Sequence, residues 1–73
     1  MILLKREREK KKMSQAELAS LSGVRQQSIS AYERGAMIPG ADALYMLATA
    51  LGCTMDELYR PDSLIDQDDE VEG

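Results

Sequence analysis

The sequence predicts an all-α fold, a compact bundle of five short helices, and three observations support this. Ser14 and Thr54 are each followed three residues later by a glutamate, a capping box that marks a helix start. Gly23, Gly35 and Gly52 each follow a run with helical spacing, and glycine supplies the left-handed residue that closes a helix. The chain has no Phe and no Trp, and a core of Leu, Ile, Ala, Met and Cys suits packed helices.

The first three helices are expected over residues 1–12, 15–21 and 26–34. In the first, lysines occupy the last turn, where cations complement the helix dipole. In the third, Ile29 and Tyr32 recur at helical spacing, which directs Ile29 inward and places Tyr32 at the edge of the core. The second and third helices, joined by a glycine corner, make a helix-turn-helix.

Two further helices are expected after a loop. Gly40 is an acceptable N-cap, and the following helix ends at Gly52. Its buried stripe is expected to consist of Leu44, Leu47, Ala48 and Leu51. The second capping box then begins a short fifth helix that holds residues 55–59.

Charge divides the chain into a domain, residues 1–60, and an acidic tail, residues 61–73. The whole chain has a net charge of −4, but residues 1–34 carry eight basic and four acidic side chains, as a nucleic-acid surface would. An ordinary scatter of charge explains the lysines at 10–12 equally well. The tail has six acidic residues, no basic residue and few apolar ones, so we expect it to be disordered.

The composition argues against an enzyme. A chain of this length buries only about 60% of its unfolded surface, which leaves little room for a deep cleft. His is absent and Cys53 is the only cysteine, so we expect no catalytic residue, no metal and no cofactor. The lone cysteine and the short apolar start, residues 1–4, indicate a cytoplasmic protein without a membrane partner.

The order of these motifs resembles the Cro and phage-repressor type of helix-turn-helix domain, also called the Xre family. The resemblance covers residues 4–58 and rests on the runs SQAELA, QQSIS and YERG, with Gly23 between the first two. The segment PGADALYMLATALGCTMDEL is similar to the family's fourth and fifth helices. The resemblance implies a lambda-repressor-like DNA-binding domain. It also implies a transcriptional regulator, more often a repressor, that binds a palindromic operator in double-stranded DNA as a dimer.

The third helix carries the residues that we expect to read bases. Adenine presents an acceptor beside a donor in the major groove, and a glutamine amide matches both. Gln26 and Gln27 lie in the first turn of this helix, the part that enters the groove deepest in this motif. Arg25 cannot cap the helix and is expected to reach a base edge or a phosphate, and Ser30 and Ala31 are further base-reading candidates, Ala31 through a thymine methyl group.

Phosphate contacts are expected from five polar or basic side chains: Ser14, Gln15, Ser28, Arg34 and Lys12. Gln15 begins the second helix, where backbone N–H groups and the helix dipole favour a phosphate. The resemblance implies that Gln15 also contacts Gln26. Such contacts set register and salt dependence rather than sequence preference.

The resemblance implies two further contacts. Arg8 is expected to form a partly buried ion pair with Glu33 of the YERG motif, the alternative being two solvated charges. The fifth helix corresponds to a region that pairs subunits in related repressors, which makes Met55, Leu58 and Tyr59 candidate dimer contacts. Closure of the monomer core explains these three residues equally well.

Two features suggest a protein partner. Met37 and Ile38 stand where family members often carry basic residues, and we expect them to pack on the core, with a partner surface as the alternative. The acidic tail suggests a second function for the same fold. This alternative is an antitoxin-like or accessory protein whose main task is to bind a protein partner through the tail.

Overall fold

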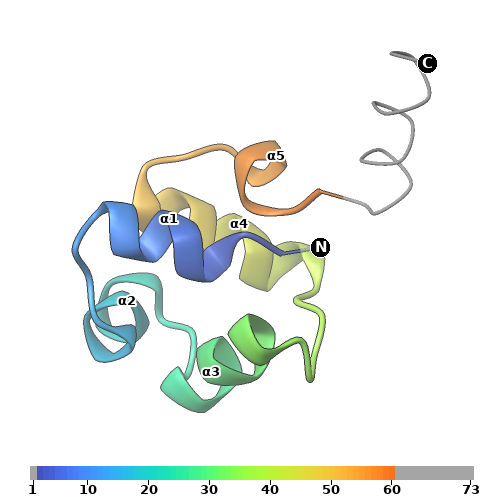
Figure 1. Ribbon diagram of the computed structural model, residues 1–73, viewed down its shortest axis with the longest axis horizontal. Helices are drawn as coiled ribbons and strands as arrows, with labels where there is room; N and C mark the ends of the chain where they lie inside the picture. Colours follow the sequence, from blue (N-terminus) through green and yellow to red (C-terminus); the bar gives the residue numbers. More distant parts are fainter. Residues whose placement is uncertain (1, 61–73) are drawn as a thin grey trace.

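The computed structural model describes residues 2–60, which fold into the five expected helices (Figure 1). The predicted all-α fold is confirmed. The helices are α1 (Leu4–Lys10), α2 (Gln15–Ser22), α3 (Gln26–Arg34), α4 (Ala41–Leu51) and α5 (Met55–Leu58). None of the helices within these residues is long and apolar enough to cross a membrane. The disorder expected for residues 61–73 concerns a segment outside the described residues.

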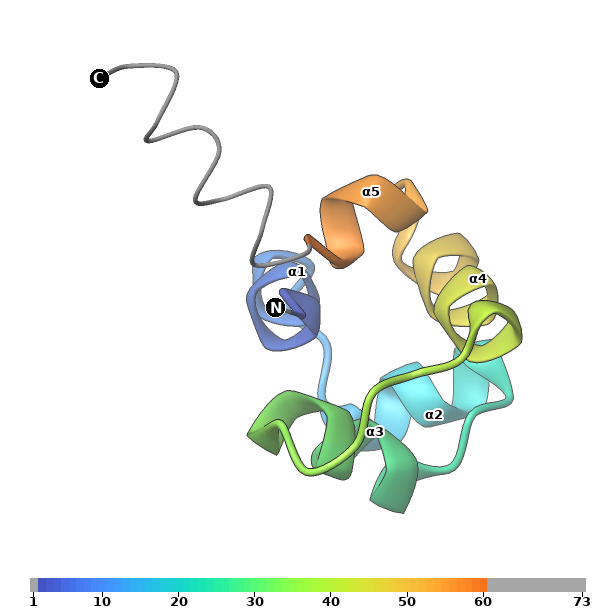
Figure 2. The same cartoon turned by 90° about the vertical axis from the view of Figure 1, so that its right-hand side faces the viewer.

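The helices surround one core, to which each of them contributes one fully buried aliphatic side chain. These side chains are Leu4, Leu18, Ile29, Leu47 and Leu58. Figure 2 shows α2 and α3 at one end of the molecule and α5 at the other, with α1 and α4 between them. Each such side chain stabilises the fold by about 1.5–3 kcal/mol through removal of apolar surface from water. The pair α2–α3 is therefore held on a scaffold formed by the other three helices.

Both predicted capping boxes are present. The Ser14 hydroxyl accepts the Glu17 N–H at 3.0 Å, and the Glu17 carboxylate accepts the Ser14 N–H at 2.8 Å. Thr54 and Glu57 make the same reciprocal pair at 3.1 and 2.8 Å. These contacts fix α2 and α5 at the positions that the sequence predicts.

The corner between α2 and α3 depends on Gly23, whose φ of 79° is in the left-handed region. A Cβ added there would lie 3.6 Å from Met46 Cε, so the site has room for it but the backbone conformation disfavours it. The Ser22 hydroxyl accepts the Val24 N–H at 3.1 Å and satisfies the backbone inside the corner. The turn thus sets the angle at which α3 leaves α2.

The first helix is shorter than the expected residues 1–12, because both of its ends are engaged in other structure. Lys12 adopts a left-handed φ of 57°, which ends the helix after Lys10. At the other end, the Leu3 N–H donates to the Leu58 carbonyl at 2.7 Å. The residues before α1 therefore lie beside the end of α5, where Ile2 forms an antiparallel bridge with Tyr59.

Leu58 does not offer the dimer contact suggested for it, because its side chain is fully buried in the monomer core. Met55 is partly buried and packs against the same core. Tyr59 is half-buried, and its backbone forms an antiparallel bridge with Ile2. For Leu58 and Met55 the structure favours the alternative interpretation, closure of the monomer core.

The expectation that Met37 and Ile38 pack on the core is wrong. Their side chains are 50% and 76% exposed. The backbone N–H groups of Ala36 and Met37 both donate to the Ala31 carbonyl, so the chain turns sharply after α3. Pro39, the next residue, takes the buried position in this loop. Two large apolar side chains are left facing solvent beside the end of α3.

The core predicts the effect of shortening one side chain of α4. Leu47→Ala is expected to lower the free energy of unfolding by about 2–5 kcal/mol, because it leaves a cavity at the centre of the bundle. Thr49→Ala, at an exposed position of the same helix, is expected to change it by at most about 0.5 kcal/mol. Urea unfolding followed by circular dichroism measures both, and equal effects would show that Leu47 is not central to the core.

Candidate nucleic-acid interface

Arg8 and Glu33 form the ion pair that the resemblance implies. Arg8 Nε donates to Glu33 Oε2 at 2.7 Å and Nη2 donates to Oε1 at 3.1 Å, so both oxygens of the carboxylate are engaged. The two side chains are only 11% and 5% exposed. This bidentate pair joins α1 to the last turn of α3.

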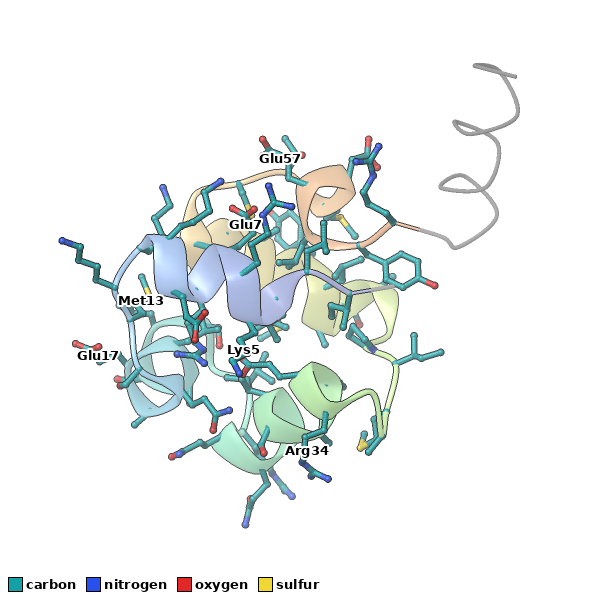
Figure 3. All side chains as sticks on the ribbon, in the orientation of Figure 1. Lys5, Glu7, Met13, Glu17, Arg34 and Glu57 are labelled. Atoms are coloured by element: carbon teal, nitrogen blue, oxygen red, sulfur yellow. The ribbon has the colours of Figure 1, made fainter. Side chains whose placement is uncertain are left out.

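The same two residues hold the start of α2. The third guanidinium nitrogen, Arg8 Nη1, donates to the carbonyl of Met13 at 2.7 Å. Figure 3 shows Met13 in the link between α1 and α2. The amide of Gln15 donates from Nε2 to Glu33 Oε1 at 3.0 Å. Among residues 2–60 the structure has no hydrogen bond between Gln15 and Gln26, so the expected brace is replaced by one to Glu33. The reason is that a fixed carboxylate is the stronger acceptor for an amide N–H.

This network keeps Glu33 ionised. Burial raises the pKa of its carboxyl group, but the hydrogen bonds from Arg8 and Gln15, together with the Arg8 charge, outweigh burial. The pKa of Glu33 therefore lies below its ordinary value. The contact with Glu33 also raises the pKa of Arg8, so both groups are charged at neutral pH.

Five polar side chains line a shallow hollow on the outer side of α2 and α3: Gln15, Gln26, Gln27, Ser30 and Arg34. Gln26 and Gln27 are exposed in the first turn of α3, whereas Ile29 and Tyr32 of the same helix are buried. Figure 3 shows Arg34 pointing away from the bundle. The fold thus gathers both glutamines expected to read bases, and two residues expected to bind phosphate, on one face.

The other residues expected to contact DNA are not among those that line this hollow. Arg25 is exposed at the N-cap of α3 and makes no side-chain cap hydrogen bond, as predicted. Ser14 is engaged in its capping box, and Ser28 is half-buried. Lys12 is exposed between α1 and α2. Arg25, Ser14 and Lys12 precede the helices that carry the hollow, and Ser28 lies within α3.

Ala31 is not positioned to contact a base, which corrects the expectation for this residue. Its side chain is only 7% exposed. The loop after α3 returns to it, because the N–H groups of Ala36 and Met37 bond to the Ala31 carbonyl. Ala31 is therefore covered, and it is not among the residues that line the hollow.

The contact between Gln15 and Glu33 is the feature of the site that sequence reasoning missed. The two residues are 18 positions apart, and no local pattern links them. The resemblance assigns Glu33 to an ion pair and Gln15 to a phosphate contact. Only the packing of α2 against α3 shows that Arg8 and Gln15 donate to the same oxygen, Glu33 Oε1.

Comparison with protein-family models matches residues 4–58 to a family described as helix-turn-helix. The match extends from the start of α1 to the end of α5. A comparison with curated proteins found no match.

The ion pair predicts how stability depends on pH. The pKa of Glu33 is lowered in the folded protein, so its contribution is complete above the ordinary glutamate pKa, about 4.3, and is lost as pH falls through the lower folded value. Glu33→Gln is expected to be less stable at pH 7 by up to about 3 kcal/mol. Its free energy of unfolding should then fall less than that of the wild type between pH 5 and pH 2.

Urea unfolding at several pH values measures this difference. Glu57, whose pKa the Thr54 backbone N–H lowers, is retained in both proteins and so cancels in the comparison. Parallel pH curves for the two proteins would show that Glu33 contributes nothing specific to acid unfolding.

Proposed function

This chain belongs to the helix-turn-helix family of DNA-binding regulators, of the Cro and Xre type, and from that premise we propose that it is a sequence-specific transcriptional repressor. In this proposal α3 lies in the major groove of double-stranded DNA, with its first turn deepest. The observation that carries the proposal is the hollow at α2 and α3, where two exposed glutamines lie beside Gln15 and Arg34.

Base reading is assigned to the exposed first turn of α3. Within the described residues the side-chain amides of Gln26 and Gln27 make no hydrogen bond, so both amides can pair with base edges. A glutamine amide matches the adenine N6 and N7 pair. Arg25 and Ser30 flank these amides and add contacts to a base edge or a neighbouring phosphate, while buried Ala31 is left out of the reading set.

Phosphate binding is assigned to the residues around the hollow. Arg34 and Lys12 supply positive charge, and Ser14, Gln15 and Ser28 supply neutral donors. The loop at residues 36–38 supplies none, because it carries apolar side chains. Phosphate contacts therefore come from the first half of the chain, where the basic residues are concentrated.

The repressor is proposed to act as a homodimer on a palindromic operator, with half-sites about one helical turn apart. Fully buried Leu58 cannot mediate this contact. Met37 and Ile38 are exposed immediately after α3, where a twofold contact would fix the spacing of two reading helices. We assign the dimer contact to this loop, with half-buried Tyr59 as the second candidate.

A protein partner bound through the acidic tail remains a prediction from composition. The tail lies outside residues 2–60, and no observation within the described residues favours this function over DNA binding. The proposed repressor acts in the cytoplasm and needs no catalytic residue, metal or cofactor, in keeping with a family that typically acts by binding.

Selection of bound duplexes from a random library, at a stated salt concentration, tests the proposal and yields the operator. Gln26→Ala is then expected to lose about 1–3 kcal/mol of binding free energy at one base pair and to relax the preference there. Arg34→Ala should instead weaken binding to all sequences alike and make the salt dependence less steep. Unchanged binding by both variants would show that the hollow is not the DNA site.

The loop predicts how subunits associate on the operator. Ile38→Ser is expected to reduce cooperative binding to a full palindrome while leaving affinity for an isolated half-site nearly unchanged, because it removes apolar surface from the dimer contact. Tyr45→Ser, at an exposed position of α4, is the matched control. Gel-shift titrations on full and half operators measure both. Loss of cooperativity in Tyr59→Ser but not in Ile38→Ser would transfer the contact to the end of α5.

A further inference from the structure

Gln15 makes its hydrogen bond to Glu33 in a way that fixes the orientation of its own amide. A carboxylate can only accept hydrogen bonds, and an amide has two N–H donors and one oxygen acceptor. Only Nε2 of Gln15 can therefore face Glu33, and it does so at 3.0 Å. The amide is left with one N–H and with Oε1, neither of which is bonded within the described residues. Both belong to a side chain that lines the hollow.

We propose that Glu33 is a positioning residue for DNA binding, which directs the second N–H of Gln15 toward a phosphate oxygen although Glu33 itself does not touch DNA. This inference rests on the proposed function, because it concerns the same hollow. A phosphate oxygen is an acceptor, so an amide turned by half a rotation would present the wrong atom to it. Glu33 excludes that rotation.

Arg8 holds the Glu33 carboxylate in the position from which it orients the Gln15 amide. The guanidinium binds both oxygens of Glu33 and also the carbonyl of Met13, so the carboxylate is fixed relative to the chain that leads into α2. Fixing a side chain before binding removes part of the entropy cost that complex formation would otherwise carry. The Gln15 amide is therefore oriented before DNA binds. The amides of Gln26 and Gln27 have no such partner and can adjust to the bases.

A double-mutant cycle separates this role from stability. The full chain is compared as wild type, Gln15→Ala, Glu33→Gln and the double variant, each titrated with the selected operator at a temperature at which circular dichroism shows it folded. Glu33→Gln is expected to weaken binding about threefold to tenfold when Gln15 is present, the factor for one hydrogen bond. In the Gln15→Ala background it should weaken binding less than about twofold, because there is no amide left to orient.

Leu47→Ala is the control for loss of stability alone. Leu47 is fully buried in the core and takes no part in the network at the hollow, so this variant should lower the melting temperature while its folded form binds DNA as tightly as the wild type. An equal loss for Glu33→Gln in both backgrounds would overturn the inference and leave the proposed function standing. Wild-type affinity for Gln15→Ala would overturn both the phosphate assignment and the inference.

A second measurement does not depend on any variant folding. In the wild-type full chain, the side-chain amide protons of Gln15 are observed by nuclear magnetic resonance before and after operator is added. One proton should be protected from solvent exchange in the free protein, because it is bonded to Glu33, and the other should become protected on binding. Fast exchange of both protons in the free protein would overturn the inference.

Discussion

The ion pair between Arg8 and Glu33 is the contact on which the arrangement of the proposed DNA face depends. Arg8 links the helix that carries it to Met13, in the segment between α1 and α2, and to the last turn of α3. A buried pair of this kind often adds little net stability, because the attraction offsets the cost of taking two charges out of water. Its directional hydrogen bonds nevertheless allow only one relative position of the three segments. Its main effect is therefore on geometry.

That geometry is useful only because the core makes the rest of the domain rigid. One aliphatic side chain from each helix meets at the centre, and the segment before α1 is bonded to the end of α5. The two ends of the domain are thus joined on the side away from α2 and α3. Separation of α1 from α5 would expose Leu4 and Leu58 to water, which opposes it.

The features that the sequence predicted well are local ones. A capping box or a closing glycine involves residues three or four positions apart, so Ser14, Thr54 and Gly23 could be assigned without knowledge of the fold. Even there the first helix was predicted too long, because a left-handed lysine at position 12 has no sequence signal comparable to glycine.

The errors concern contacts between distant segments. The sequence left two roles open for Leu58, and it placed Ala31 on the outward face. Only the packing of α5 and the return of the loop after α3 show that both residues are buried. In the loop after α3, Pro39 is the buried residue, and the neighbouring Ile38 is exposed. Within the candidate site, the pattern predicted which residues gather at the hollow but not that Gln15 and Glu33 share a hydrogen bond.

The composition of the hollow bears on how such a domain can recognise DNA. Four of its five lining side chains are neutral, and the adjoining loop carries no basic residue. The hollow itself contains one cation, Arg34, so affinity that arises there without charge must come from hydrogen bonds of correct geometry. A hydrogen bond between neutral groups contributes less binding free energy when one of the two side chains must first be ordered. On a face that binds through amides, a buried carboxylate that fixes one amide therefore increases affinity more than another lysine at the edge would.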